Sequence, residues 1–548
     1  MSRRSVMNHQ FSQIPRAEIQ RSRFNRSCGY KTTFDSGYLV PIFVDEVLPG
    51  DTFSLRCNLF ARLATPIVPF MDNMYLDTFW FYVPNRLLWD HWEEMNGYQA
   101  NPGDSTDFLV PTIKAPSTGW QVGSLSDYMG VPTQVPNIEI NALHHRAYNL
   151  IYNEWFRDEN LQNSVPVNTG DGPDPDTDYV LLRRGKRHDY FTSALPWPQK
   201  GPGVELPLGG TAPVSVYGNG YALGLIGTSA DGSGTILGGV PAAVANSGID
   251  LCDSSTWPLP VGSATGSHTP TKGYTAIGVT RAAQDSGLIG TADLSSATAA
   301  TINSLRQAFQ IQKMYEKDAR GGTRYTEILR AHFGVVSPDA RLQRPEYLGG
   351  SSTRVHINPV QQTSATDSTS PQGNLAAFGV VGDSFHGFTK SFVEHGVIIG
   401  LVNVRADLTY QQGIDRMFSR QTRFDFYWPT LAHLGEQAIL NKEIYAQGTS
   451  ADNQVFGYQE RYAEYRYKPS KITGKFRSNY AQSLDYWHLS QYFGSLPTLS
   501  PAFIEDNPPL SRVIAVQSEP QFLFDAYFDI NCVRPMPVYG VPGLVDHF

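Results

Sequence analysis

Residues 53–63 alternate between apolar and polar side chains, and this pattern constrains the fold more than any other stretch. A period of two places successive side chains on opposite faces of a strand, so one face of this strand must be buried. The residues of the apolar parity are Phe53, Leu55, Cys57, Leu59, Ala61 and Leu63. The chain is therefore expected to build a sheet against a core, organised around residues 51–96.

The next segment, MYLDTFWFYV at residues 74–83, ends in five consecutive apolar or aromatic residues. A run with no polar side predicts a strand that is covered on both faces. Pro84 has no backbone N–H and is expected to end the strand. Helical spacing then leads to Gly97, which predicts a short amphipathic helix with a glycine stop. Its expected apolar face consists of Leu87, Leu88, His91, Trp92 and Met95.

Further elements are expected along the chain. Helical spacing predicts helices from Asn141, with a face of Leu143, Ala147, Leu150, Ile151 and Trp155, from Ile302, and over residues 325–333 up to Gly334. Strands are predicted at residues 395–408, 423–431, 456–476 and 521–533. The last strand alternates as residues 53–63 do. The expected fold class is therefore mainly β, a sandwich that holds the first and last strands in one core, as in a jelly roll.

Composition favours a loop-rich β protein. The 548 residues include 49 Gly and 37 Pro, while 12% are aromatic and only 17% are charged. Aromatic residues at this level must be buried or used at contacts. The formal net charge of -8 argues against a protein whose whole surface binds nucleic acid.

The first 31 residues have the opposite charge. They contain one acidic residue, Glu18, and seven basic residues, namely Arg3, Arg4, Arg16, Arg21, Arg23, Arg26 and Lys31. This asymmetry predicts a basic, polar arm. A disordered tail that only solubilises the chain is the alternative.

Residues 201–301 differ from the rest in composition. They contain 19 glycines, and only eight residues between Pro202 and Ala300 are charged. The segment is interpreted as an insertion, and its apolar islands VSVYGNGYALGLIG and YTAIGVT are expected to form strands. Low charge and small residues favour a surface that contacts copies of itself or a receptor. A flexible loop is the alternative.

The four cysteines, Cys28, Cys57, Cys252 and Cys532, are far apart and form no CxxC pair, which argues against a disulfide scaffold or a zinc ribbon. The N-terminus lacks the apolar core of a signal peptide. The longest apolar run, residues 395–404, is about half of the roughly 20 residues that span a bilayer. A soluble protein made in the cytoplasm is expected.

Catalytic motifs are incomplete. Neither Gly185-Lys186 nor Gly474-Lys475 has the preceding glycine of a phosphate-binding loop. The GNGYALG run misses the dinucleotide spacing by one residue. Gly382-Asp383-Ser384 does not complete the GxSxG elbow of a hydrolase serine and is expected in a loop.

Metal motifs are incomplete as well. Asp174, Asp176 and Asp178 begin like a calcium loop, but Tyr179 stands at the position of the required glycine, so an exposed acidic turn is expected. His144 and His145 are adjacent and cannot form an i, i+4 metal pair, and His433 and Glu436 fit no zinc motif. No metal, cofactor or catalytic residue is predicted. The run ERYAEYRYKPSKITGKFR fits either a single-strand nucleic-acid platform or a sheet face with extended cations, and the second is favoured.

Several long segments carry a family resemblance. They include GYLVPIFVDEVLPGDTF, FMDNMYLDTFWFYVPNRLLWDHWEEMNG, INSLRQAFQIQKMYEKDARGGTRYTEILRAHFGV and the terminal CVRPMPVYGVPGLVDHF. In this order they closely resemble the major capsid proteins of the gokushovirus branch of the Microviridae, which are small single-stranded DNA bacteriophages. The resemblance implies an eight-stranded antiparallel jelly roll of the viral capsid type, with long loop insertions and a few helices, in a T=1 icosahedral shell around circular single-stranded DNA.

The same resemblance implies partners and a layout. The partners are further copies of the chain, an internal scaffolding protein, a pilot protein, a small DNA-binding protein, the packaged DNA and a host surface receptor, with no membrane insertion. The locations are the virion and, during assembly, the host cytoplasm. The expected first domain is an interior arm at 1–31, whose seven cations face DNA or bind a neighbouring subunit. It is followed by the first part of the jelly roll at 32–200, a surface protrusion at the three-fold axis at 201–301, and the rest of the jelly roll at 302–548.

Two other classes of protein were weighed. A secreted β-sandwich glycosidase or carbohydrate-binding protein would suit the aromatic, Gly and Pro content, but a glycosidase needs a pair of carboxylates in a cleft, and no such pair is recognisable in the sequence. A bacterial adhesin would be expected to show export signals and repeats, and neither is visible.

Overall fold

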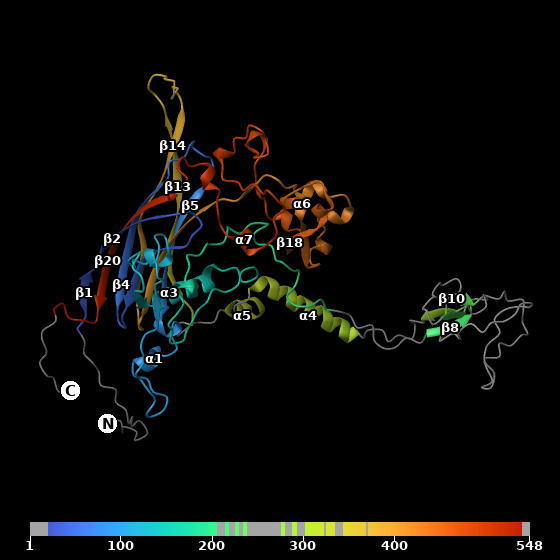
Figure 1. The fold of residues 1–548 in the computed structure, drawn as a ribbon, viewed down its shortest axis with the longest axis horizontal. Helices are drawn as coiled ribbons and strands as arrows, with labels where there is room; N and C mark the ends of the chain where they lie inside the picture. Colours follow the sequence, from blue (N-terminus) through green and yellow to red (C-terminus); the bar gives the residue numbers. More distant parts are fainter. Residues whose placement is uncertain are drawn as a thin grey trace, which may run out of the picture. The chain divides into compact units, whose positions relative to one another are not determined.

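The computed structural model describes residues 20–204, 214–218, 225–228, 234–237, 276–279, 288–292, 302–322, 325–334, 343–368 and 371–539. The chain divides into two compact units, residues 1–201 with 315–548 and residues 202–314. The larger unit contains a nine-stranded antiparallel sheet (Figure 1). Its strands are β1 Ser22–Asn25, β2 Cys28–Phe34, β3 Val40–Val47, β4 Thr52–Leu63, β5 Met74–Pro84, β13 Glu346–Gln361, β14 Leu375–Ser391, β15 Gly396–Ala406 and β20 Phe522–Arg534.

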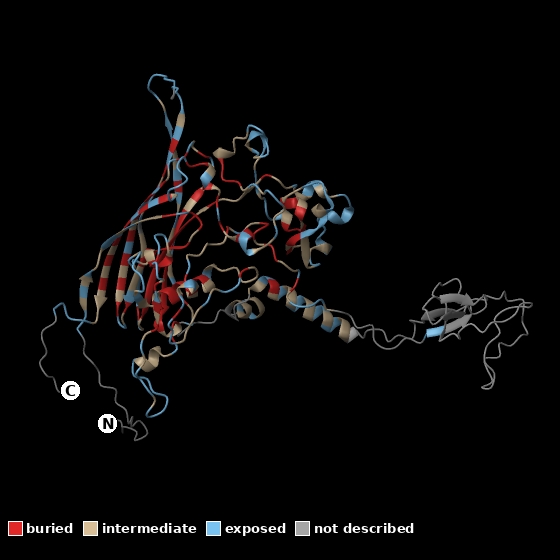
Figure 2. Ribbon diagram, in the orientation of Figure 1, coloured by how far each residue is buried: buried red, intermediate tan, exposed pale blue. Residues whose placement is uncertain are grey.

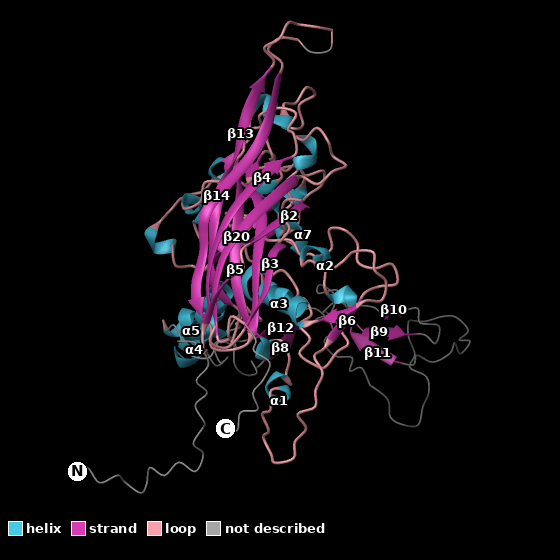
Figure 3. Ribbon diagram, turned by 90° about the vertical axis from the view of Figure 1, so that its left-hand side faces the viewer, coloured by secondary structure: helices cyan, strands magenta, loops and turns pink. Residues whose placement is uncertain are grey.

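The strand order is β1–β20–β4–β14–β13–β5–β15–β3, and β2 also pairs with β20. β13 changes its partner along its length, because its first part pairs with β5 as far as Val355 and its last part pairs with β14 from His356 onward. The sheet therefore divides at this hairpin into two halves (Figure 3). One half is β3–β15–β5–β13, and the other is β14–β4–β20, with both β1 and β2 paired to β20.

Aromatic side chains from the two halves meet in the interior. The ring of Phe43 on β3 lies 5.2 Å from that of Phe528 on β20, and Trp80 on β5 lies 5.8 Å from the same ring. Contacts of this kind require the two halves to face each other, as the layers of a sandwich do. The mainly β fold class is confirmed. The sheet has nine strands against the eight expected, because β1 and β2 both pair with β20.

The alternation of residues 53–63 has the predicted consequence. All six residues of the apolar parity are at most 5% exposed, whereas Arg56, Phe60 and Arg62 face solvent. Figure 2 shows buried and exposed residues alternating along the strands. On β5, Trp80 packs in the core between the halves and Phe81 packs in a second core on the other face. The prediction that this strand is covered on both faces is therefore confirmed.

The second core is closed by α3, Leu143–Ile151. Leu143, Ala147 and Ile151 are buried against Phe81 and the outer face of β15. These three residues confirm most of the predicted apolar face. Trp155 is 39% exposed instead, because the helix changes to a π-helical turn at Tyr152–Phe156. A change of helical period rotates the residues that follow it out of the stripe.

The predicted helices after residue 301 are present as α4 Ile302–Gly321 and α5 Tyr325–Phe333, and Gly334 follows with a φ of 70°. The remaining helices are single turns, α1 Trp92–Met95, α2 Leu125–Tyr128, α6 Asn441–Ile444 and α7 Pro501–Ile504. The smaller strands of the larger unit are β6 Thr112–Lys114, β7 Glu139–Asn141, β16 Thr409–Tyr410, β17 Glu436–Leu440, β18 Val455–Glu460 and β19 Ser470–Lys471.

The smaller unit contains short antiparallel strands, and both apolar islands of residues 201–301 contribute to them as predicted. Most of that segment lies outside the described residues. The strands are β8 Val214–Gly218, β9 Leu225–Thr228, β10 Gly234–Leu237, β11 Ala276–Val279 and β12 Leu288–Ala292.

The helix predicted over residues 87–95 with a stop at Gly97 forms only in its last turn, after which Gly97 has a φ of 98°. The chain instead forms a 3-10 turn at Asn85–Leu87 and the single turn α1. Trp89, between them, is fully buried, and its Nε1 donates to Asp171 Oδ1 at 2.8 Å. This anchor interrupts the helical path, since tertiary packing outweighs the weak preference of a short helix.

The strand predicted at 423–431 was also wrong, because the segment forms 3-10 turns at Arg423–Asp425 and Pro429–Leu431. Asp425 Oδ2 accepts from the backbone N–H of Thr422 at 2.7 Å, and such local bonds compete with strand pairing. The strand predicted at 456–476 is interrupted, because only β18 and the two-residue β19 pair within this range. Tyr462 has a φ of 63°, which is incompatible with an extended strand.

The two longest strands, β13 and β14, were not predicted. Their sequences contain Gly, Ser, Asn and Pro, which are depleted in strands and obscure a period of two. Gly382-Asp383-Ser384 lies within β14 and not in the expected loop. A β-bulge between Asp383 and His386 accompanies it.

Candidate nucleic-acid interface and subunit surfaces

The described part of the basic segment is an edge of the sheet. Arg23 lies on β1, Lys31 lies on β2, and Arg26 lies in the bend between them. Both strands pair with β20, since Phe24 is opposite Cys532 and Tyr30 is opposite Ala526. Of the remaining predicted DNA-facing residues, Arg21 directly precedes β1, and Arg3, Arg4 and Arg16 lie outside the described residues.

Arg21 and Arg23 bond only to uncharged groups in the described part of the chain. Arg21 Nη2 donates to Gly50 O at 2.6 Å and to Thr52 Oγ1 at 2.9 Å. Arg23 Nη2 donates to Asn531 Oδ1 at 2.7 Å. Both residues are exposed. A guanidinium without a carboxylate partner keeps its full charge for an outside anion.

Arg26 and Lys31 are compensated within the chain. Arg26 forms a two-bond pair with Asp45, at 2.6 and 2.9 Å, and Lys31 Nζ lies 2.7 Å from Asp525 Oδ1. A paired cation contributes less to phosphate binding, because its partner repels the phosphate. The four described cations therefore fall into two kinds, and their role toward DNA stays a prediction.

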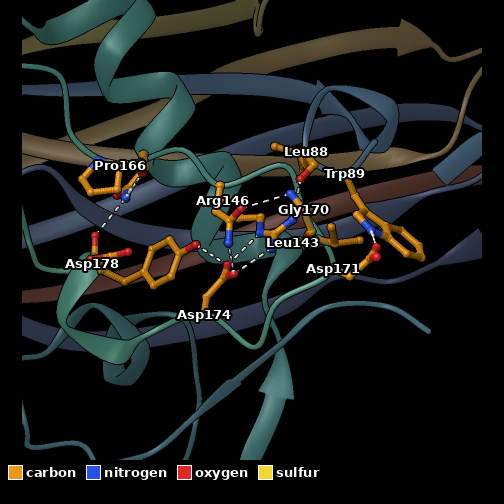
Figure 4. Close-up of polar contacts among 12 residues, drawn as sticks. Leu88, Trp89, Leu143, Arg146, Pro166, Gly170, Asp171, Asp174 and Asp178 are labelled. Carbon is orange, nitrogen blue, oxygen red and sulfur yellow. Dashed lines mark hydrogen bonds and ion pairs between the residues drawn. The ribbon is translucent and has the colours of Figure 1, made fainter. Parts of the chain in front are cut away.

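The acidic run at 174–178 is occupied by protein donors (Figure 4). Asp174 accepts from Arg146 Nε and Nη2, each at 2.7 Å, from Tyr179 OH at 2.5 Å and from Asn168 Nδ2 at 2.6 Å. Burial raises the pKa of Asp174, but these bonds outweigh it and hold the pKa below its ordinary value. The run was expected to be an exposed acidic turn. Its first residue, Asp174, is instead buried in a salt bridge with Arg146.

The histidines singled out by the sequence have separate roles. His145 is buried, its Nε2 lies 2.9 Å from Ser126 Oγ, and burial lowers its pKa to about 3. His144 instead lies 3.7 Å from Glu46. His433 is exposed. Among the described residues, no cluster of His, Cys, Asp and Glu could hold a metal ion, and Cys28, Cys57 and Cys532 are free thiols.

The aromatic and basic run at 460–477 does not form a nucleic-acid platform in this subunit. Tyr462 is buried, and its OH donates to Phe426 O at 3.0 Å. Lys471 lies 2.5 Å from Asp415, and Arg466 is paired with Glu460. Because two of its cations already have carboxylate partners, the run cannot offer a continuous line of charges to phosphates.

Sequence reasoning missed a hollow of about 870 Å³ beside β5 and β13. Arg184 and Arg405 both bond to Asp77 at its wall, at 2.6 and 3.1 Å, and Arg184 lies over the ring of Phe79 at 4.6 Å. The basic run RRGKR at 183–187 was the signal that could have indicated it. These contacts tie the connection after α3 to the sheet.

A surface loop carries a dense group of exposed aromatic residues. Phe418 is 73% exposed and Phe424 is 65% exposed, and the neighbouring Phe426, Tyr427 and Trp428 are also exposed. Aromatic side chains in such numbers mark surfaces that bind another protein. No helix in the described ranges is long and apolar enough to cross a membrane.

A β-sandwich with long connections and a group of exposed aromatic side chains is typical of a structural subunit of an assembly. Residues 12–544 match the family described as Capsid protein (F protein). The chain belongs to this family of phage capsid proteins, so it is a structural virion protein and not an enzyme.

Three relatives carry the name Capsid protein VP1. That of Bdellovibrio phage phiMH2K is 52% identical over 555 residues, and that of Chlamydia phage 1 is 48% identical over 601 residues; each match covers 98% of this chain and 98% of the relative. That of Spiroplasma virus 4 is 38% identical over 581 residues and 99% of both chains. The resemblance to gokushovirus-type Microviridae is thereby confirmed, and the secreted carbohydrate-active enzyme and the adhesin are set aside.

Proposed function

We propose that the chain is the subunit of a T=1 icosahedral shell that encloses circular single-stranded DNA, and that the basic end of the chain faces the genome. The observation that carries the DNA role is the pair of exposed guanidiniums, Arg21 and Arg23, that have only uncharged partners. A confined genome requires cations at the shell wall, and arginine binds phosphate well because its donors form a planar fork.

The DNA contact is sequence-independent in this proposal. Each phosphate contact that releases counterions contributes a log–log salt slope of about -0.7 for single strands. The change Arg21→Gln with Arg23→Gln is therefore expected to reduce the slope of DNA release by about 1.4 if each side chain engages one phosphate. DNA content per particle should fall as well, because packaged phosphates lose two compensating charges per subunit.

The matched control is Lys31→Gln with Asp525→Asn. It also changes two exposed residues, but it removes an ion pair and leaves the net charge unchanged. Particles of the control should hold and release DNA like the unaltered ones. Equal DNA content and equal salt response in the Arg21 and Arg23 variant would refute the DNA role, and normal DNA affinity with failed assembly would indicate a clasp between subunits.

Residues 201–301 are proposed to mediate host attachment as a surface protrusion at the three-fold axis. Their low charge and high glycine content support a contact role. A short Gly/Ser linker in their place should leave the sandwich folded, because the entropy of loop closure changes slowly with loop length. Particles of this variant should assemble and fail to adsorb to host cells. Failure of the variant chain to fold would place the segment in the core instead.

The proposal also includes an internal scaffolding protein, a pilot protein, a small DNA-binding protein and a host surface receptor as partners, with assembly in the host cytoplasm. Family membership supports these partners only by analogy. Affinity purification of tagged particles from infected cells, followed by mass spectrometry, is the direct test.

A further inference from the structure

β13 and β14 continue as a two-stranded ribbon beyond the point where both neighbouring strands stop. β5 stops pairing with β13 at Val355, and β4 stops pairing with β14 at Gly379. Residues 358–361 and 375–378 form four cross-strand pairs with each other, and no other described strand joins them. We call these eight residues the ribbon. It projects from the sheet in Figures 1 and 3.

One face of the ribbon is mostly apolar and open to solvent, with Asn358 as its polar member opposite Phe378. Val360 is directly opposite Ala376, and Phe378 is two residues farther along the same strand, so the three side chains share a face. Val360 is 47% exposed, Phe378 is 38% exposed, and Ala376 is also exposed. Figure 2 shows the upper end of this hairpin as mostly exposed.

Two paired strands alone contribute little stability to the ribbon in water. An isolated pair of strands is at best marginally stable, and three or more strands or a packed face are needed to stabilise it. Both outer edges also lack a described partner strand, and such edges pair readily with another chain. Ala377 on the opposite face is only 2% exposed, so that face is covered within the subunit. The Val360 and Phe378 face and both edges have no described partner and are free to meet a surface from outside the subunit.

The charge of the ribbon indicates which kind of partner it can bind. The sequence contains no Lys or Arg from residue 355 to residue 389, so the ribbon offers nothing to phosphate groups. A strongly basic or acidic protein partner gains no charge complementarity here either. A neutral apolar surface suits an identical neighbour, because copies of one chain carry the same charge and repel wherever charged groups oppose each other.

We propose that the ribbon is a docking element that packs its Val360 and Phe378 face against a second copy of this chain. The inference rests on the proposed function, because the shell is what brings copies side by side. The two side chains act as the buried anchors of the contact. An aromatic and a branched aliphatic side chain at the centre of a small contact are expected to carry most of its binding free energy.

The test uses the change Val360→Asn with Phe378→Asn in the full chain. The free subunit should unfold at nearly the same urea concentration as the unaltered chain, because both side chains already face solvent. The yield of sedimenting particles from producing cells should fall at least tenfold. Val393→Asn is the matched control, since Val393 is 83% exposed and lies in the turn after β14. Its particles should form normally.

A shorter ribbon gives a second variant. Replacing residues 359–377 by Asn-Gly joins Asn358 to Phe378 through a two-residue turn and keeps every pair that β13 and β14 make with their neighbours.

Hydrogen exchange provides a measurement that needs no variant. The backbone amides of the ribbon should exchange at least tenfold more slowly in empty, DNA-free particles than in free subunits.

The outcomes separate the inference from the proposed function. If the unaltered chain never forms particles, the shell itself is refuted, and the docking element with it. If unaltered particles form and the ribbon variants form them equally well, only the docking element is refuted. Protection of the ribbon that appears only with DNA or with another viral protein present would also overturn it, since the partner would then not be a second copy.

Discussion

The Arg146 guanidinium and the Asp174 carboxylate form an ion pair that is entirely closed to solvent, with 2.7 Å between Nε and Oδ2. Arg146 Nη1 also donates to Leu88 O at 2.9 Å, and Nη2 donates to Gly170 O at 2.9 Å. One side chain of α3 thereby holds the segment after β5 and the loop before Tyr179 (Figure 4). The long connection between β5 and β13 is fixed to the second core at this point.

Removing one partner of this pair should destabilise the subunit strongly. Asp174→Asn leaves a buried guanidinium without its counter-charge, and the expected loss is about 3–5 kcal/mol in the free energy of unfolding. Urea unfolding of the free subunit is the measurement. Lys31→Gln, in the exposed pair with Asp525, should cost at most about 1 kcal/mol. Equal effects of the two changes would contradict the structural role of the buried pair.

The two parities of β4 should respond differently to substitution. Leu55 is 1% exposed, and Leu55→Ala should cost about 2–5 kcal/mol because it leaves a cavity between the two halves of the sheet. Phe60 on the same strand is 52% exposed, and Phe60→Ser should change the unfolding free energy of the free subunit by at most about 0.5 kcal/mol. A large loss at Phe60 would mean that this face of the strand is covered within the subunit.

Asp506 should make the subunit less stable as the pH rises. Burial raises the pKa of its carboxyl from 3.8 to about 7, although Arg405 and Lys186 oppose the shift. Between these values the folded chain holds a proton that the unfolded chain has released, so this group's contribution to stability falls with rising pH. Asp506→Asn removes that contribution. The difference between variant and unaltered chain in urea midpoint should grow from pH 5 to pH 7.5, and a constant difference would contradict the shift.

His145 should act in the opposite direction. Burial lowers the pKa of His145 from 6.5 to about 3. Between these two pH values the unfolded chain binds a proton that the folded chain does not bind. Its contribution to stability is present above pH 6.5 and is lost as the pH falls toward 3. His145→Gln should reduce the loss of stability between pH 7 and pH 4.5.

Much of the fold could be predicted because its signals are local. The alternation of β4 and β20, the apolar run of β5 and the helical spacing of α3 to α5 each arise from a few neighbouring side chains. The errors occurred where a distant contact or a local bond decided the outcome. Trp89 ended a helix by bonding to Asp171, and Asp425 replaced a strand by accepting from Thr422.

The candidate site was predictable only as a charge pattern. The sequence located the seven basic residues near the N-terminus, but it could not separate Arg21 and Arg23 from Arg26 and Lys31. That separation depends on Asp45 and Asp525, of which Asp525 is 494 residues from its lysine and reaches it through the pairing of β2 with β20.

By itself, the sequence determined the strands with a buried face, the family and the basic character of the first 31 residues. Periodicity, sequence similarity and charge can all be read directly from the order of the residues. Only the tertiary structure decided that β13 leaves β5 for β14 at Val355, that the acidic run begins as a partner of Arg146, and that four pairs of residues stand beyond the sheet. Each of these depends on which distant segments meet, and the free energy of burial and pairing that selects those meetings belongs to the whole fold.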